Sequence, residues 1–307
     1  MDTAVKLYSY LTKRDEVLSL LYFRMPYFLI LISLFVVWPQ PAYSQDQDVS
    51  TWQEVTRSST PMSGSRMVWW NASNRSDYYW KVFKEGNAVK AVLDKDAKRS
   101  QEQPPFTPKV ENLEYAAASF KVDDGWLIGF NHGEFGRALY WFDHSGKSRY
   151  KISNHQVVAF FPSFDGILAI EGLSHLSHSY GSIIRITKSQ QWKAEKVTLL
   201  PEAPYAGVQF RDGRLLLVLS DSLAEYFRKG DRETLRFLEK DGDWGGLYPN
   251  SVVLTDDQTK AYIGMGQFVA EYEFERRMLR FLIPNVSFLN KLDADEEQAI
   301  RRSYGPP

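Results

Sequence analysis

An apolar run, a short turn built on aspartate and a second apolar run recur along this chain. These hairpins constrain the fold more than any other feature, because Asp-Gly pairs accept the backbone conformations that a tight turn between two strands requires. The turn is an Asp-Gly pair in three copies and Asp256-Asp257 in the fourth. The copies span Ala117–Phe130, Val158–Leu173, Tyr205–Ser220 and Leu247–Phe274. The repetition predicts an all-β protein.

Two further strand-like runs follow each hairpin, for example "ALYWFD" and "SRYKIS" after the first copy. The turns recur every 41 to 47 residues, a period typical of one four-stranded propeller blade. The number of residues after residue 44, divided by about 45 residues per blade, gives just under six blades. The predicted fold is therefore a β-propeller of about five or six four-stranded blades. A β-sandwich with similar hairpins is the alternative.

An earlier copy is less regular. The runs "RMVWWNAS", "DYYWKVFKEG" and "NAVKAVLDK" predict the second, third and fourth strands of a blade whose first strand is missing. We expect the other end of the chain to supply that strand, which would leave no exposed sheet edge. The proline-rich stretch "AKRSQEQPPFTPKVENLE" predicts a surface connection. The segment "DADEEQAIRRSY" predicts a short C-terminal helix or tail, with acidic residues first and basic residues last.

The N-terminus resembles a targeting segment. The apolar run Pro26–Trp38 follows Arg24 and precedes small residues at Ala42 and Ser44, which is typical of a signal peptide and too short to span a bilayer comfortably. We divide the chain into a signal peptide (1–44), a propeller (45–286) and a C-terminal tail (287–307). An uncleaved anchor is the alternative, and Met25 is an alternative start. The mature protein is expected in the periplasm or secreted, with no membrane insertion after cleavage.

Composition excludes several kinds of site and partner. The net charge is −1, with acidic and basic residues intermixed, so no basic stripe predicts nucleic-acid binding. Cysteine is absent, which excludes disulfides, cysteine nucleophiles and thiolate metal sites. No glycine-rich phosphate loop follows a strand and opens a helix. Serines are too frequent for any Ser-His-Asp set to be identified.

Two loops contain the candidate site residues. In a propeller, the loops after the second strand of neighbouring blades lie on one end face, and the candidates occupy two such loops. Glycines beside charged and aromatic residues often mark a pocket. A metal site at the two histidines of the second loop is the alternative, although a metal would need further ligands that the spacing does not supply. The predicted binding residues in these loops are His132, Glu134, Arg137, Glu171, His175 and His178.

Asn250 is the seventh candidate. The run "PNSVVLTDDQTKAYIG" resembles the hairpin of calcium-dependent lactonases of the gluconolactonase and senescence-marker type. In that six-bladed family, an asparagine before an inner strand binds the metal in the central channel. The equivalent positions in the other copies are Ala117, Val158 and Tyr205, whereas hard cations prefer oxygen ligands such as carboxylates and amides. A structural role for Asn250 is therefore the other interpretation.

Three blocks within Asp123–Phe274 resemble a family of uncharacterised bacterial propeller-like proteins. They follow the patterns G-E-(aromatic)-G, E-G-L-x-H-L and Y-P-N-S. The resemblance implies a bacterial propeller and brings no known activity.

The sequence predicts a monomeric binding module without a cofactor. Its partner would be a protein, a peptide or an envelope polymer, and one form is an inhibitor or immunity-type protein. The alternative is a metal-dependent hydrolase or lactonase, which would use a divalent cation such as calcium held by Asn250 with Glu171 or His175.

Overall fold

The computed structural model describes residues 47–55, 79–93, 103–113, 116–175, 178–242, 244 and 246–288. All belong to one unit, Tyr43–Pro307. The predicted signal peptide and the helix expected at 293–304 lie outside these ranges. Residues 286–288 are helical, and the Asn285 side chain caps them by accepting from the amide of Phe288 at 3.0 Å. Within the described ranges, no helix is long and apolar enough to cross a membrane.

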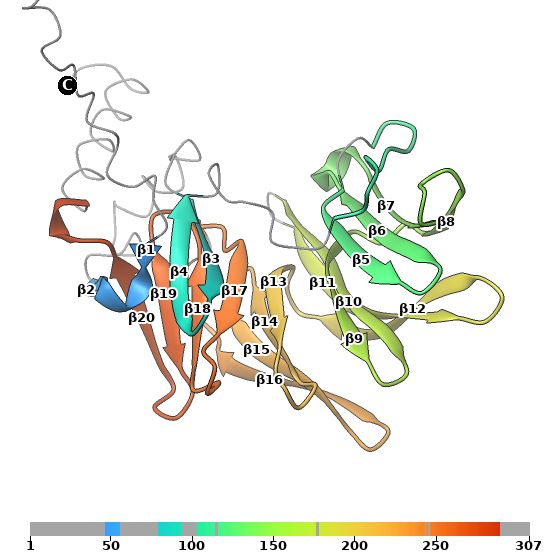
Figure 1. The fold of residues 1–307 in the computed structure, drawn as a ribbon. Coiled ribbons are helices and arrows are strands. Elements are labelled where there is room, and N and C mark those ends of the chain that lie inside the picture. The colour runs from blue at the N-terminus through green and yellow to red at the C-terminus, as the bar shows by residue number, and fades with distance from the viewer. Residues whose placement is uncertain are drawn as a thin grey trace, which may run out of the picture. The chain divides into compact units, whose positions relative to one another are not determined.

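The described residues form five antiparallel sheets (Figure 1). Each sheet is a blade, and its innermost strand is named first below. Blade 1 contains β3 (Trp80–Glu85), β4 (Ala88–Leu93) and β1 (Gln47–Asp48); blade 2 contains β5 (Ala118–Val122), β6 (Gly125–Asn131), β7 (Arg137–Phe142) and β8 (Arg149–Ser153); blade 3 contains β9 (Val157–Ser163), β10 (Gly166–His175), β11 (His178–Lys188) and β12 (Trp192–Leu200); blade 4 contains β13 (Pro204–Gln209), β14 (Leu215–Leu219), β15 (Leu223–Lys229) and β16 (Arg232–Glu239); blade 5 contains β17 (Ser251–Leu254), β18 (Lys260–Gly264), β19 (Val269–Glu273), β20 (Met278–Ile283) and β2 (Gln53–Val55).

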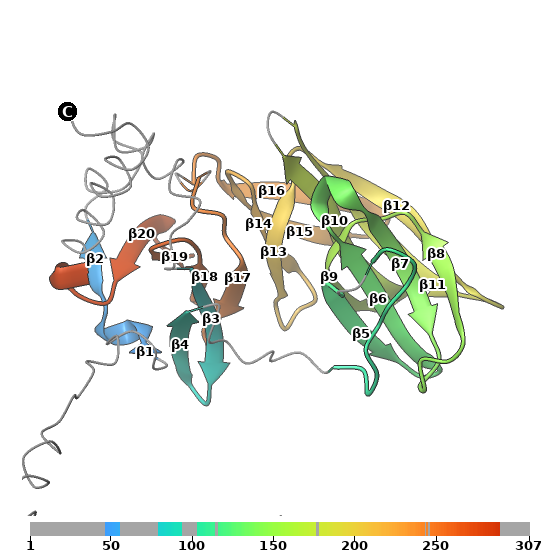
Figure 2. The same cartoon turned by 90° about the horizontal axis from the view of Figure 1, so that it is seen from above.

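The innermost strands identify the architecture as a β-propeller. Strand β5 contacts β9, β9 contacts β13, β13 contacts β17, and β17 contacts β3. Figure 2 shows these sheets side by side in chain order from blade 2 to blade 5. All five innermost strands line one cavity. The predicted propeller is confirmed, with five blades among the described residues.

The aspartate turns join the first two strands of blades 2 to 5, as the repeat predicts. In blade 4, Gly213 supplies the positive φ of the turn, at 88°, and its amide donates to the carbonyl of Phe210 at 3.0 Å. In blade 5, Gln258 holds the matching position at φ 58°, and its amide donates to the carbonyl of Thr255 at 2.9 Å. The fourth copy therefore keeps the turn without its glycine.

The strand assignment expected for blade 1 is wrong. The run predicted as a third strand contains β3, which is innermost, and the next run is β4. Trp80 and Val82 on β3 are buried in one apolar cluster with Val252 and Ile263 of blade 5. Strand β3 contacts β17, the innermost strand of blade 5, and lines the same cavity, which identifies β3 as the innermost strand of blade 1. Residues 47–55 instead supply outer strands, since β1 pairs with β4 and β2 pairs with β20. The run "RMVWWNAS" lies outside the described residues.

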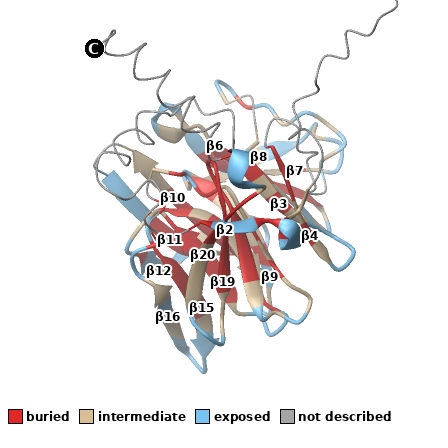
Figure 3. Ribbon diagram, turned by 90° about the vertical axis from the view of Figure 1, so that its left-hand side faces the viewer, coloured by how far each residue is buried: buried red, intermediate tan, exposed pale blue. Residues whose placement is uncertain are grey.

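Apolar side chains fill the space between successive blades. Separate clusters join blades 2 and 3, blades 3 and 4, and blades 4, 5 and 1. Figure 3 shows buried residues along strands such as β6, β10 and β19, whereas the outer strands β12 and β16 carry exposed residues. Because blades 3, 4 and 5 each pack on two neighbouring blades, the loops at the ends of their strands are held in place.

Residues 103–113 belong to the predicted surface connection and pack on blade 2. The Phe106 ring lies 5.5 Å from that of Phe142, centroid to centroid. Val110 is buried in the same apolar cluster, and Leu113 packs against it. Leu113 also fills the space beside Gly136, where a Cβ would lie 2.5 Å from its Cδ2 atom. The connection therefore supports the loop between β6 and β7.

Candidate functional site

The loop between β6 and β7 carries the predicted residues His132 and Glu134. It contains the 3-10 turn η4 (Gly133–Phe135). The amide of His132 donates to the carbonyl of Gly136 at 2.9 Å, and the amide of Phe135 donates to the carbonyl of His132 at 3.2 Å. The Phe135 side chain is 86% exposed. The loop is thus internally hydrogen-bonded and presents an apolar ring to solvent.

The predicted histidine loop of blade 3 is instead a strand hairpin. Strand β10 continues through Glu171 to His175, and β11 begins at His178. His175 and His178 are register partners across the two strands. The expectation of a loop over Glu171–His178 is wrong, because the β10–β11 ladder remains paired up to His175 and His178. Within the described ranges, no group of three or more His, Asp or Glu residues is placed to hold a metal ion.

Two contacts join blade 2 to blade 3 at this end of the sheets. The Nε2 atom of His175 lies 3.1 Å from the Oε2 atom of Glu134. The guanidinium of Arg137 donates from Nη1 to the Tyr180 hydroxyl at 2.7 Å. All four side chains are partly or largely exposed; Tyr180, for example, is 41% exposed. Three predicted residues, Glu134 and Arg137 of blade 2 and His175 of blade 3, therefore lie on one surface.

Glu171 lies beneath this surface and is 7% exposed. Its Oε1 atom accepts from the Ser182 hydroxyl, and its Oε2 atom accepts from the amide of Gln156 at 3.4 Å. The side-chain nitrogen of Gln156 donates to Asn131 Oδ1 at 2.7 Å and to the carbonyl of Gly133 at 3.0 Å. This buried network ties blade 3 to the loop of blade 2. Glu171 is thus placed to support the surface residues.

His155 lies close to this network without forming part of the exposed surface. Its Nδ1 atom lies 2.8 Å from the Ser153 hydroxyl. Burial lowers the pKa of His155, and the nearby carboxylate of Glu171 opposes this effect only in part. His155 is consequently neutral near pH 7.

Sequence reasoning missed Phe135 and Tyr180. Phe135 is the aromatic residue of the G-E-(aromatic)-G block, and this position was the signal that could have found it. Aromatic residues fill the core of a propeller, so the sequence could not distinguish an exposed ring from a buried one. Tyr180 follows His178 in a segment that the sequence assigned to a loop, where no face could be predicted.

Asn250 holds the hydroxyl of Ser251, and Ser251 in turn links blade 5 to blade 1. The Oδ1 atom of Asn250 accepts from the Ser251 hydroxyl at 2.8 Å, and Ser251 Oγ accepts from the amide of Val82 at 2.9 Å. The amide of Asn250 donates to the carbonyl of Gly264 at 2.9 Å. These bonds support the structural interpretation of Asn250.

Asn250 and the equivalent positions in the other blades line the cavity between the innermost strands. Ala117, Val158 and Tyr205 are all lining residues, as counting back from each turn predicts. The described lining residues include no Asp, Glu or His, and neither Glu171 nor His175 is among them. Calcium requires several oxygen ligands, usually including carboxylates. This set of donors does not fit a calcium ion.

A scan with protein-family models found no match, and a search of curated proteins found none either. Similar solved structures include a 6-phosphogluconolactonase-like protein from Bacteroides uniformis, at 12% identity over 69% of each chain with a TM-score of 0.42. Virginiamycin B lyase from Staphylococcus aureus matches at 17% identity over 55% of this chain and 56% of the lyase, with a TM-score of 0.38. The chain thus spans little more than half of the lyase. Since both scores are below 0.5, the propeller architecture rests on the sheets described above.

Proposed function

We propose that this protein is a binding module that recognises a protein or peptide through one end of blades 2 and 3. We call this surface the loop face and define it by Glu134, Phe135, Arg137, His175 and Tyr180. The observation that carries the proposal is the pair of contacts between the blades, Glu134 with His175 and Arg137 with Tyr180. Surface contacts of this kind add little stability, so their value lies in fixing a shared recognition surface.

The chemistry of the loop face favours a protein or peptide over other ligands. Phe135 offers an exposed apolar ring next to Glu134 in the chain, and Arg137 donates to the Tyr180 hydroxyl of the neighbouring blade. Aromatic residues and arginine dominate the energetics of protein interfaces, and charged residues commonly surround an apolar centre. An inhibitor or immunity-type protein is one form of such a module. Binding to an envelope polymer is a distinct outcome that the same experiment detects.

Replacing Phe135 with alanine is expected to weaken partner binding by at least about tenfold, which corresponds to about 1.4 kcal/mol. The measurement is affinity capture from envelope extract, followed by titration of the captured partner against each variant. Phe164 provides a matched control, since it is a fully exposed phenylalanine in the β9–β10 turn. That turn lies at the other end of blade 3, so Phe164→Ala should bind as the unchanged protein does.

Equal binding by the Phe135→Ala and Phe164→Ala variants would overturn the loop face as the binding surface. Capture of a polysaccharide, with no protein titrating against the face, would also contradict the proposal. Arg137→Ala provides a second arm, because it removes the charge and the hydrogen bond to Tyr180 while leaving Phe135 in place.

Export is the second part of the proposal. A fusion of residues 1–44 to alkaline phosphatase, which is active only outside the cytoplasm, is expected to give active enzyme. A fusion beginning at Met25 tests the shorter start, since it retains the apolar run Pro26–Trp38. An inactive reporter from both fusions would contradict a periplasmic or secreted location.

A further inference from the structure

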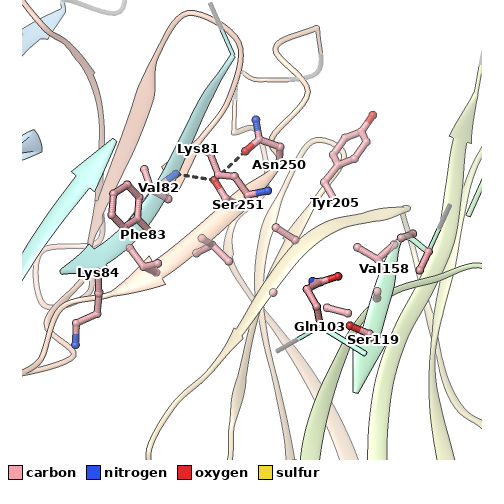
Figure 4. A pocket seen from close by; sticks show the side chains of 18 residues that line it. Lys81, Val82, Phe83, Lys84, Gln103, Ser119, Val158, Tyr205, Asn250 and Ser251 are labelled. Atoms are coloured by element: carbon pink, nitrogen blue, oxygen red, sulfur yellow. Dashed lines mark hydrogen bonds between the residues drawn. The ribbon is translucent and has the colours of Figure 1, made fainter. Parts of the chain in front are cut away.

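A second cavity, of about 470 Å³, lies between blades 4 and 5. It shares no described residue with the cavity between the innermost strands, which Figure 4 shows. Its volume falls within the usual range for small-molecule sites, about 300–1,000 Å³. The described lining consists of three phenylalanines, a leucine, three arginines, a glutamate and a glutamine. Aromatic rings together with charged groups that fix the orientation of a ligand are typical of a binding site.

Aromatic rings form most of the apolar part of this lining. The rings of Phe210 in blade 4 and Phe274 in blade 5 meet edge to face, 5.5 Å apart between centroids. Phe210 is buried in the apolar cluster that joins the blades, and Leu238 packs against that cluster. Phe237 is 36% exposed, so its ring is available to a ligand. Aromatic rings prefer offset or edge-to-face contacts with other rings, so the lining favours a ligand with an aromatic body.

A buried glutamate orients two of the three arginines. Glu225 is 2% exposed, and its carboxylate accepts from Nη1 of Arg214 at 2.8 Å and from Nη2 of Arg236. Arg214 also donates from Nε to Asp212 at 2.7 Å, and its guanidinium lies over the Phe210 ring, 4.5 Å from the centroid. These contacts hold the two guanidinium groups in place before a ligand arrives, which lowers the entropic cost of binding.

Arg277 is the third arginine of the lining, in the β19–β20 turn. No described residue forms an ion pair with Arg277, whereas the preceding residue, Arg276, pairs with Glu273 at 3.4 Å. The described lining therefore contains three guanidinium groups and a single carboxylate, that of Glu225. An excess of cations in a cavity attracts an anion. The planar fork of a guanidinium group matches a carboxylate in a bidentate geometry.

Two lining residues hold a backbone conformation for which blade 4 uses glycine. Gln258 has φ 58° in the first turn of blade 5, where Gly213 of blade 4 has φ 88°. Arg277 has φ 52° in the last turn of blade 5, where Gly230 of blade 4 has φ 60°. A positive φ is unfavourable for a residue with a Cβ atom, and such residues cluster at ligand sites. Glycine would relieve the strain but would remove two side chains from the same cavity.

We propose that the cavity between blades 4 and 5 binds a small aromatic carboxylate. Arg277 pairs with the carboxylate group, and the carboxamide of Gln258 is a further donor. Phe237 and Phe274 contact the ring of the ligand. The site lies in blades 4 and 5, whereas the loop face lies in blades 2 and 3, so each proposal can fail without the other.

Benzoate, benzamide and cyclohexanecarboxylate separate the contributions of charge and ring. Benzoate is expected to bind the purified protein at least about tenfold more tightly than benzamide, because only benzoate gains a charged pair. It is expected to bind about fivefold more tightly than cyclohexanecarboxylate, which lacks the aromatic contacts. Ligand-observed NMR titration measures all three. Arg277→Gln should remove the preference for benzoate over benzamide. Arg276→Gln is the matched control, because it removes the same charge from the preceding position, outside the described lining, and should retain the preference.

Gln258→Gly gives the first turn of blade 5 the residue that blade 4 has at the matching position. This variant should have a higher urea midpoint, since glycine adopts a positive φ without strain. It should also bind benzoate about fivefold more weakly, since the carboxamide donor is lost. A purely structural role for Gln258 predicts the first effect without the second.

Three results would overturn the proposal. The first is an absence of saturable binding by benzoate, or binding of benzoate no tighter than that of either analogue. The second is an equal loss in Arg277→Gln and Arg276→Gln. The third is unchanged benzoate binding by Gln258→Gly. Circular dichroism of each variant separates loss of fold from loss of the site.

Discussion

Replacing Glu271 with glutamine is expected to lower the free energy of unfolding by about 3 kcal/mol. Glu271 is 3% exposed on β19 of blade 5. Its carboxylate accepts from the Tyr262 hydroxyl at 2.6 Å, from Nε of Arg280 at 3.1 Å and from Nζ of Lys260 at 3.3 Å. Glutamine keeps the shape but removes the charge, so two cations lose their shared partner. Arg280 keeps Glu54 as a partner at 3.4 Å, which limits the loss.

Glu273 supplies the matched control for this variant. It lies two residues further along the same strand, and its partner is the exposed Arg276, at 3.4 Å. An ion pair with one exposed member is screened by solvent and contributes at most about 1 kcal/mol, so Glu273→Gln should change the urea midpoint only slightly. Urea denaturation of both variants measures the difference. Equal midpoints would show that the buried carboxylate adds nothing beyond an ordinary surface pair.

The same carboxylate makes stability depend on pH. Burial by itself raises the pKa of Glu271, but the Tyr262 hydroxyl and the Arg280 guanidinium more than offset this and hold the pKa below its ordinary value of 4.5. A carboxyl with a depressed pKa contributes its full stabilisation above the unfolded value and loses it as the pH falls through the folded pKa. The difference in free energy of unfolding between the unchanged protein and Glu271→Gln should therefore be constant above about pH 5 and become smaller below it.

Blade 4 also has a buried glutamate that pairs with two cationic side chains, at the same strand positions as in blade 5. Glu225 is buried on β15, pairs with Arg214 near the first turn, and lies directly opposite Arg236 on β16. Glu271 likewise lies directly opposite Arg280 on β20. In both blades the first cation precedes the glutamate by eleven residues, as Arg214 and Lys260 do. The pattern of apolar residues does not reveal this repeated pair of a cation and a buried glutamate, although the eleven-residue spacing is present in the sequence.

The period of the aspartate turns was enough to predict the propeller, because blades 2 to 5 each carry the hairpin in the same place. Blade 1 has no such turn between its described strands: Gly86 follows Glu85 in a tight connection between β3 and β4. Without the aspartate marker, the order of its strands could not be assigned from apolar runs. Pairing of β2 with β20 joins residues far apart in the sequence, and no local pattern encodes it.

The candidate site was predicted in part for a related reason. Strand order predicts where the loops lie, and Glu134 does lie in the loop after the second strand of blade 2, whereas Arg137 begins β7 and His175 ends β10. Burial depends on the neighbouring blade. The sequence alone does not indicate that the Glu171 carboxylate is buried. The structure shows that it faces inward and accepts from the amide of Gln156. Exposure of Phe135 likewise depends on what the loop leaves uncovered.

Replacing Gly125 with alanine is expected to destabilise the protein by about 4 kcal/mol, the sum of an unfavourable backbone conformation and a steric overlap. Gly125 follows the aspartate of the blade 2 turn at φ 152°, and a Cβ there would lie 1.9 Å from the carbonyl oxygen of Phe142. That oxygen belongs to β7, so the third strand of the blade would have to move. No flexible side chain can absorb the overlap.

Gly213 provides a comparison, because it also follows an aspartate and has a positive φ, but it lies within the β13–β14 turn, whereas Gly125 is the first residue of β6 and pairs with Val122. The φ of Gly213 is 88°, and a Cβ there would meet nothing within 4 Å. Gly213→Ala should therefore cost only the backbone term, about 1–2 kcal/mol. Displacement of β7 in Gly125→Ala would also move Arg137, the first residue of that strand, so this variant should weaken partner binding whereas Gly213→Ala should not. Equal unfolding midpoints for the two variants in urea would show that β7 can move away from the added Cβ at little cost in free energy. The loop face would then rest on a less rigid strand than the packing of blade 2 implies.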